Sequence, residues 1–323
     1  MIRDAVVIGA GWAGLKAATE LSAAGHKVLV LEKSRGAGGR SATRRIDGAR
    51  FDHGAQYFTA RSAAFGRRLQ QWRDAGLVQP WKPRLAVIGG RAGHGNPEDT
   101  PRFVGVPGMN AVCRQLAEPL ECRYRQRVTG VRLDQVWQVS LDDGESIEAR
   151  RLVVTAPPAQ AAELLGATDP LHERLSAVAF NPCIAVMLDF EQAFDPGFDA
   201  AFVNTDGALA WIARDSSKPG RDGNAWLLHA GADWSRDHLE ESFDDLAARL
   251  AAAFGEVVGE ALPASRVCAA HRWRYSQAVE AFDDGALVDT ERRLAIAGDW
   301  LAGSRIEGAW TSGRKAGQAL ASL

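Results

Sequence analysis

The chain has 323 residues, and its 38 Lys and Arg residues nearly balance 40 Asp and Glu residues, which gives a formal net charge of -2 at pH 7. This balance argues against general nucleic-acid binding, which needs a basic surplus, and no apolar run approaches the roughly 20 residues of a membrane-spanning helix. The length predicts two domains. The four cysteines have neither CxxC nor metal-ligand spacing. We therefore expect no metal and a cytoplasmic protein with reduced thiols and no targeting signal.

A glycine motif follows the first strand-like run. The apolar run 5–8 leads directly into Gly9-Ala10-Gly11-Trp12-Ala13-Gly14, and a helical pattern follows. In this setting Gly9 permits a tight turn, Gly11 lets the backbone approach a pyrophosphate, and Gly14 lets the helix pack closely on the sheet. We expect a dinucleotide to bind here, with its phosphates at the helix N-terminus. The predicted contacts are Gly9, Gly11, Ala13 and Gly14.

An acidic residue ends the second strand-like run. Glu32 comes directly after the apolar run 28–31, where a carboxylate accepts hydrogen bonds from an adenosine ribose. A 2′-phosphate would meet this negative charge, so the position favours FAD or NAD over NADP.

The segment after Glu32 distinguishes FAD from NAD. Residues 33–41 contain two adjacent glycines and a cation, and they lack the helical periodicity expected of an NAD domain at this point. This segment resembles the E-x-x-x-x-x-GGR pattern of the flavin amine oxidase superfamily. The resemblance implies FAD, with Lys33, Gly39 and Arg40 at the cofactor and Gln56 and Tyr57 at the isoalloxazine. A surface charge at Arg40 and a core aromatic at Tyr57 are the alternatives.

Two further segments resemble the same superfamily. A strand-like run at 294–297 precedes Gly298 and Asp299, and Glu307-Gly308-Ala309 opens a final helix that runs to Leu323. An Asp in this place suits ribityl hydroxyls, and helix amides suit the flavin C2 carbonyl and N1. The resemblance also implies a strand at 151–154 that returns to the FAD sheet, and Val128 near the adenine. No cysteine lies near 298–310, so we expect FAD to be bound non-covalently.

The middle of the chain narrows the resemblance to the bacterial renalase branch of this superfamily. The residues that carry it include Asp52-His53-Gly54-Ala55-Gln56-Tyr57, Trp211-Ile212-Ala213-Arg214, His271-Arg272-Trp273 and Gly298-Asp299-Trp300. The resemblance implies an enzyme that oxidises 2- or 6-dihydronicotinamide isomers of NAD(P)H to NAD(P)+. Hydride would pass to flavin N5 and the electrons to oxygen, giving hydrogen peroxide.

The expected fold is α/β, with a Rossmann-like FAD-binding domain and a discontinuous α+β substrate-binding domain that contains an antiparallel sheet. We predict the FAD-binding domain over 1–60, 106–165 and 290–323, and the substrate-binding domain over 61–105 and 166–289. Strands are expected at 183–190, 208–213, 225–229 and 267–273, and one helix at 235–254. The glycine-rich stretch from 89 to 97 predicts a hairpin or loop.

Tyr57, His229, His271 and Trp273 are the candidates for positioning a substrate, since the two histidines and Trp273 stand on strands expected near the flavin. A hydrogen-bonded structural role is the alternative for both histidines. Many flavin amine oxidases place a lysine near flavin N5, whereas the comparable run 180–186 has none and Lys218 stands in a loop. An FAD-dependent amine or amino-acid oxidase remains an alternative, and a non-enzymatic flavin-binding protein a further one.

Overall fold

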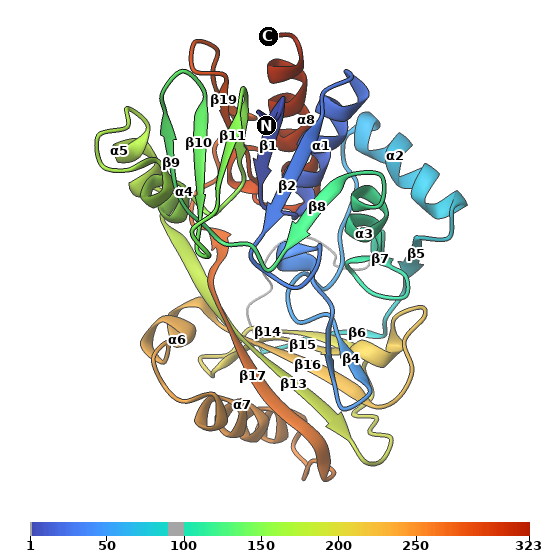
Figure 1. Ribbon diagram of the computed structural model, residues 1–323. Helices are drawn as coiled ribbons and strands as arrows, with labels where there is room; N and C mark the ends of the chain where they lie inside the picture. Colours follow the sequence, from blue (N-terminus) through green and yellow to red (C-terminus); the bar gives the residue numbers. More distant parts are fainter. Residues whose placement is uncertain (1, 90–99) are drawn as a thin grey trace. The chain divides into compact units, whose positions relative to one another are not determined.

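The computed structural model describes residues 2–89 and 100–323 (Figure 1). It contains two compact units. Unit 1 comprises Met1–Gly39, Val112–Ala179 and Gln277–Leu323, and unit 2 comprises Arg40–Ala111 and Phe180–Ser276. Most of the hairpin or loop predicted at 89–97 lies outside the described residues.

Unit 1 is built on a mostly parallel sheet. Its strands, in spatial order, are β18 (Leu287–Asp289), β19 (Leu294–Ile296), β12 (Leu152–Val154), β1 (Ala5–Ile8), β2 (Val28–Glu32) and β8 (Glu121–Tyr124). Only the edge pair β18–β19 is antiparallel. The four inner strands are fully buried and almost wholly apolar, as is typical of parallel strands covered on both faces. The predicted return of 151–154 to this sheet is confirmed, because β12 pairs with both β1 and β19.

Two glycine-containing helices pack together beside this sheet: α1 (Trp12–Ala23) and α8 (Ile306–Ala321), which lie next to each other in Figure 1. A Cβ on Gly313 of α8 would stand 2.1 Å from the carbonyl oxygen of Ala13, and one on Gly317 would stand 2.6 Å from that of Ala17. At the start of α1, a Cβ on Gly14 would lie 1.9 Å from the Gly9 carbonyl oxygen. The close approach predicted at Gly14 is therefore confirmed.

The rest of unit 1 consists of a small antiparallel sheet and short helices. The sheet orders β11 (Ser146–Ala149), β10 (Trp137–Leu141) and β9 (Val128–Leu133). The helices are α3 (Ala111–Ala117), α4 (Pro158–Leu165), α5 (His172–Ser176) and the 3-10 turn η3 (Asp299–Leu301).

Unit 2 contains the expected antiparallel sheet, which is extended at one edge by a parallel pair, β14 and β6. Its strands, in spatial order, are β17 (Ser265–Ala278), β13 (Phe180–Phe190), β16 (Ala225–Ala230), β15 (Leu209–Arg214), β14 (Ala200–Val203) and β6 (Leu85–Ile88). Among the described residues of this unit, the other elements are the hairpin β3 (Arg44–Ile46) and β4 (Ala49–Phe51), the two-stranded sheet β5 (Val78–Trp81) and β7 (Arg102–Gly105), the 3-10 turns η1 (Gly39–Ser41) and η2 (Asp215–Ser217), and the helices α2 (Ala63–Asp74), α6 (Ala232–Asp237) and α7 (Phe243–Val258). Both parts of the predicted fold class are thus present.

The two faces of this sheet bury different partners, because side chains alternate between the faces with a period of two. Val186, Leu228 and Ile212 belong to a core that contains Leu250 and Phe254 of α7, and Figure 1 shows α7 against this side. The next residue along each strand points the other way. On that second face, Met187 and Leu227 pack with Phe51 of the β3–β4 hairpin.

The single helix predicted at 235–254 is wrong in this detail, because the structure has two helices, α6 and α7, separated by 238–242. The side chain of Ser242 accepts a hydrogen bond from the backbone N–H of Asp245 at 3.1 Å and caps the N-terminus of α7. An N-cap residue has non-helical dihedral angles, so the helix begins anew there.

The unit boundaries differ from the predicted domains at four segments. Residues 40–60 and 106–111 group with unit 2, whereas 166–179 and 277–289 group with unit 1. These segments group with the strands and hairpins that they contact, and local sequence patterns do not encode such contacts. The β3–β4 hairpin packs on the antiparallel sheet, and β18 pairs with β19 in the parallel sheet.

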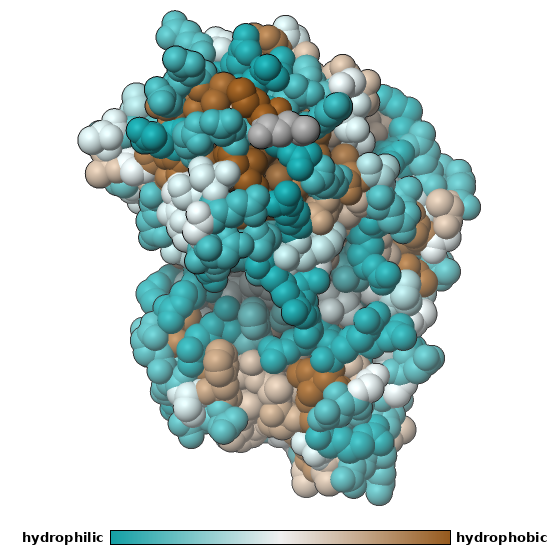
Figure 2. All heavy atoms as spheres, in the orientation of Figure 1, coloured by the Kyte–Doolittle hydropathy of each residue, from teal (hydrophilic) through white to brown (hydrophobic). Residues whose placement is uncertain are grey.

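Hydrophilic residues cover most of the face drawn in Figure 2, interrupted by separate hydrophobic patches. Across residues 2–89 and 100–323, none of the helices combines the length and hydropathy needed to cross a membrane.

We predict that Gly313→Ala destabilises unit 1 by about 1–3 kcal/mol, because the added methyl group must push α8 away from the Ala13 carbonyl. Thermal or urea unfolding measures the change. The matched control is Gly66→Ala in α2, where a Cβ meets nothing within 4 Å and should stabilise by about 0.5–1 kcal/mol. Equal effects at the two positions would contradict the assigned α1–α8 packing.

Candidate functional site

The β1–α1 turn of unit 1 lies against the second glycine segment. Gly9 has φ of +106°, a conformation that favours glycine. The backbone N–H of Gly38 donates to the Ala10 carbonyl at 2.9 Å, and a Cβ on Gly11 would stand 4.0 Å from the Cα of Gly39. The structure thus brings together two glycine loops that stand about 25 residues apart in the sequence.

Glu32 is buried at the end of β2, beside the same turn. Its carboxylate accepts hydrogen bonds from the backbone N–H groups of Ala10 at 2.8 Å and Ser34 at 2.7 Å. An ionised carboxylate offers about four lone-pair directions, so two bonds leave capacity for ribose hydroxyls. The neighbouring Lys33 donates to the side chain of Gln160 at 3.2 Å, which turns its ammonium group toward α4.

The C-terminal glycine segment forms one compact piece with the start of α8. The backbone N–H of Gly298 donates to the hydroxyl of Ser312 at 2.9 Å. A Cβ on Gly308 would lie 2.3 Å from the Ala302 carbonyl oxygen and 3.2 Å from that of Asp299. Glu307 and Ala309 stand in the first turn of α8. Elsewhere in unit 1, Val128 begins β9, paired with Leu141.

These features of unit 1 fit an FAD. The N-cap residue of α1 is Gly11, which has no side chain to cap the helix, and Gly11 and Gly39 face each other without a Cβ on either, which suits a pyrophosphate at the helix N-terminus. The fixed carboxylate of Glu32 supplies an acceptor for the ribose. The individual contacts of all these residues with the cofactor stay predictions.

In unit 2, three of the predicted positioning residues gather around one that sequence reasoning did not select, His53. His271 and Trp273 are two residues apart on β17, and their ring centroids lie 4.8 and 4.9 Å from that of His53. Trp273 Nε1 donates to the His53 carbonyl at 2.8 Å, and His229 Nε2 lies 3.3 Å from the same oxygen. We call His53, His229, His271 and Trp273 the imidazole cluster. In the sequence, the only feature that points to His53 is its position between Asp52 and Gly54.

The fourth predicted residue, Tyr57, lies in a different aromatic group. Its ring centroid is 5.8 Å from that of Trp211 and 6.3 Å from that of Trp81. The guanidinium of Arg102 stands 5.2 Å from the Tyr57 ring centroid, within the range of a cation–π interaction. Tyr57 is therefore joined to the cluster through the backbone of segment 52–58, which carries both His53 and Tyr57.

The three imidazoles are uncharged at neutral pH. Burial lowers the pKa of His53 to about 3, and His271 and Arg44 add to the effect. Burial likewise lowers the pKa of His229 to about 4, although the His53 carbonyl opposes it, and the pKa of His271 to about 4 with help from Arg44. Such groups can donate and accept hydrogen bonds, but they are weak bases at pH 7.

Two further predicted residues make internal contacts in unit 2. Arg40 donates to the Ser276 carbonyl at 3.0 Å, and its guanidinium lies 5.9 Å from the Phe180 ring centroid. The side-chain amide of Gln56 accepts a hydrogen bond from Lys218 at 3.1 Å. Lys218, expected in a loop, follows the 3-10 turn η2 and is fully buried.

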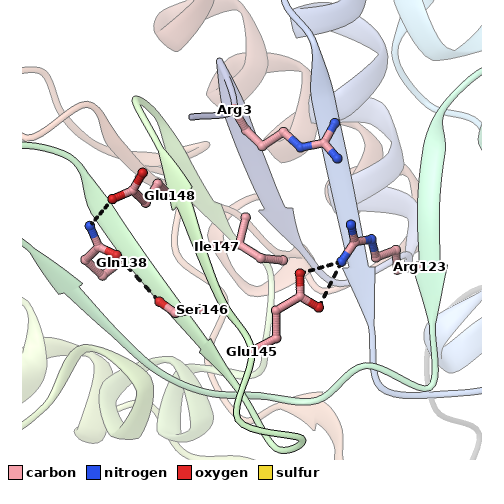
Figure 3. A pocket seen from close by; sticks show the side chains of 7 residues that line it. All are labelled: Arg3, Arg123, Gln138, Glu145, Ser146, Ile147 and Glu148. Atoms are coloured by element: carbon pink, nitrogen blue, oxygen red, sulfur yellow. Dashed lines mark hydrogen bonds and ion pairs between the residues drawn. The ribbon is translucent and has the colours of Figure 1, made fainter. Parts of the chain in front are cut away.

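Figure 3 shows a pocket on unit 1 that is unrelated to these residues. Its volume is about 420 Å³, and it is lined by Arg3, Arg123, Gln138, Glu145, Ser146, Ile147 and Glu148. Several of the lining groups pair with one another, as the Arg123–Glu145 ion pair at 2.9 Å and the Gln138–Glu148 hydrogen bond at 3.1 Å show. None of the predicted site residues lines this pocket, so we do not assign the chemistry to it.

The comparisons with known proteins agree with a flavin-binding fold. A family model described as flavin containing amine oxidoreductase matches residues 81–321, and one described as NAD(P)-binding Rossmann-like domain matches residues 7–72. The chain belongs to the flavin containing amine oxidoreductase family. The predictions of an FAD-dependent oxidoreductase and of non-covalently bound FAD are confirmed at the level of this family.

Individual relatives match in part or in fold. A putative flavin-containing monoamine oxidase, AofH, of Mycobacterium tuberculosis is 36% identical over 104 residues, which cover 27% of this chain and 23% of that protein. The match thus spans about a quarter of that relative's length.

Two solved structures superpose over nearly the whole chain. A putative protoporphyrinogen oxidase from Exiguobacterium sp. 255-15 has a TM-score of 0.79 at 13% identity and covers 99% of both chains. A putrescine oxidase bound to putrescine has a TM-score of 0.75 at 15% identity and covers 98% of both chains. At such identities these structures show the fold alone.

We predict that Glu32→Ala weakens FAD binding by one to two orders of magnitude, because charge-assisted hydrogen bonds of about 1.5–3 kcal/mol are lost. Titration of apoprotein with FAD measures the dissociation constant. Glu145→Ala, which removes a carboxylate from the surface of the same unit, is the control and should bind FAD as the wild type does. Unchanged affinity in the Glu32 variant would exclude the ribose role.

A second prediction concerns stability and pH. The pKa of His229 is about 4 in the folded protein and about 6.5 in the unfolded chain, so the unfolded state binds more protons between these values. Folding stability therefore falls as the pH is lowered through this window. His229→Gln should remove up to about 1.4 kcal/mol per pH unit of that slope. Urea unfolding across the window measures it, and an unchanged slope would show that His229 titrates normally.

Proposed function

We propose that the protein is an FAD-dependent oxidase of the renalase type, which oxidises 2- or 6-dihydronicotinamide isomers of NAD(P)H to NAD(P)+. Bound FAD supplies a hydride acceptor at N5 and transfers the electrons to oxygen, which gives hydrogen peroxide. The cytoplasmic location and oxygen as the partner belong to the same proposal and rest on the sequence.

The observation that carries this proposal is the uncharged imidazole cluster. A dihydropyridine ring needs no base to lose hydride, because its departure leaves an aromatic pyridinium. An amine must first be neutral before its C–H hydride can leave. The histidines have pKa values of about 3 to 4, so none is suited to remove the proton of an alkylammonium ion at neutral pH.

The hydrogen bonding of the cluster supports the same substrate class. Among the described residues, the buried Nδ1 of His53 has no hydrogen-bond partner. Buried polar atoms usually have a hydrogen-bond partner, and a carboxamide on the substrate ring would provide one for Nδ1 of His53. His229, His271 and Trp273 would then orient the ring together with Tyr57.

An amine or amino-acid oxidase is the second candidate, and the comparisons support it at least as well. The family model that covers 81–321 is that of amine oxidoreductases, and the named relatives include a putative monoamine oxidase and a putrescine oxidase. Two observations argue against an amine oxidase. The strand β13 carries no lysine, and Lys218 is held by buried carboxylates.

Anaerobic stopped-flow mixing with 2- or 6-dihydronicotinamide dinucleotides should bleach the flavin rapidly, at rates that depend little on pH across neutrality. The physical reason is that neither the substrate ring nor the imidazole cluster changes charge there. Putrescine and an aromatic amine serve as the comparison reductants. Fast bleaching by the amines alone, with rates that rise tenfold per pH unit as the amine deprotonates, would establish the amine oxidase instead.

A further inference from the structure

Unit 2 contains a buried ionic network that the proposed chemistry does not use: Asp52, Asp215, Lys218 and Arg221. Their exposed fractions are 0%, 0%, 1% and 7%. Lys218 Nζ forms an ion pair with Asp215 and lies 3.7 Å from Asp52, and Arg221 forms an ion pair with Asp52. Two carboxylates and two cations thus balance inside the protein.

The 3-10 turn η2 aligns the first pair. In a 3-10 turn the side chains of residues i and i+3 lie one above the other, which is the spacing of Asp215 and Lys218. The turn is short and closed by the Lys218 N–H, which donates to the Asp215 carbonyl at 3.1 Å. The other carboxylate oxygen of Asp215 accepts from the backbone N–H of Asp52 at 3.0 Å. Local geometry therefore directs the side chains of Asp215 and Lys218 toward segment 52–58.

Lys218 also fixes the orientation of the Gln56 amide. An ammonium group can only donate, so it must face Oε1 of Gln56, which it does at 3.1 Å. The Gln56 Nε2 then donates to the carbonyls of Asp52 and Gly54. Lys218 therefore fixes the Gln56 amide from outside segment 52–58, and the amide in turn fixes the backbone of that segment.

Stability alone does not explain this network, because replacing a buried ion pair by apolar groups is often neutral or stabilising. Its contacts converge instead on segment 52–58. Asp52 accepts further hydrogen bonds from Thr43 at 2.7 Å and from the backbone N–H of Met109 at 2.9 Å. The segment carries His53 and Tyr57, two side chains that belong to the proposed substrate-positioning groups.

We propose that Lys218 and Asp215 are positioning residues, which hold segment 52–58 through the Gln56 amide so that His53 and Tyr57 keep the geometry needed for substrate oxidation. The consequence for activity rests on the proposed function, whereas the consequence for the segment itself does not. In this arrangement Lys218 acts through Gln56 and takes no proton from the substrate.

The test removes both members of one buried ion pair, so that no charge is left unpaired. Lys218→Met/Asp215→Asn is compared with Arg266→Met/Asp189→Asn, a more exposed ion pair in the same unit with an Arg266–Asp189 distance of 2.9 Å. Hydrogen–deuterium exchange of a peptide covering 52–58 is measured beside a peptide from α7. Anaerobic flavin reduction by a 6-dihydronicotinamide dinucleotide and by putrescine is followed on the same holoproteins.

We expect the Lys218/Asp215 variant to keep its FAD, to exchange 52–58 about tenfold faster and α7 unchanged, and to reduce its flavin on the order of tenfold to a hundredfold more slowly at saturation. The half-saturating concentration of the reductant should stay within about threefold, as expected when orientation and not binding is lost. The Arg266/Asp189 control should show none of these changes.

Unchanged exchange over 52–58 would overturn the proposal, as would faster exchange with an unchanged limiting rate. If neither reductant bleaches the wild type, the proposed function fails, and the exchange measurement alone decides the positioning role. If the double variant does not fold, Gln56→Met takes its place. This substitution leaves all four charges paired and should still loosen 52–58, and protection equal to the wild type would again overturn the proposal.

Discussion

Unit 1 depends on the approach of one backbone to another at positions where no Cβ is tolerated. Gly14 lies against the Gly9 carbonyl, and Gly313 against the Ala13 carbonyl. Because the second contact joins the first helix to the last, the two ends of the chain form one cofactor-binding framework around the buried parallel strands. The same lack of side chains, at Gly11 and Gly39, leaves space for a pyrophosphate.

Unit 2 uses the other elementary property of regular structure, the alternation of side chains along a strand. One face of its sheet packs against α7 and forms a hydrophobic core with it. The opposite face is apolar under the β3–β4 hairpin, and its strands also carry His229, His271 and Trp273. Segment 52–58 continues directly from this hairpin, so one piece of chain both covers the apolar end and supplies His53 and Tyr57. The buried ionic network and the imidazole cluster are neighbours because both are built on that segment.

Sequence reasoning located the buried strands and the first and last helices, since long apolar runs and the glycine motifs beside them are local signals. It missed the break between α6 and α7, where a single Ser competes with an otherwise continuous helical pattern. It also assigned the β3–β4 hairpin to the FAD-binding domain, whereas the hairpin groups with unit 2. The sequence of a short hairpin does not determine which sheet the hairpin will cover.

The sequence by itself determined the turn around Gly9 and the individual buried strands, because each depends on residues that are close together in the chain. It also determined the class of cofactor, through the resemblance of several short segments to one superfamily. Only the tertiary structure decided that His53 joins His229 and His271, and that Lys218 is buried between Asp215 and Asp52. Their partners stand more than 150 residues away in several cases. The meeting of such side chains, and the pKa shifts that follow from their burial, depends on the path of the whole chain and not on any local period.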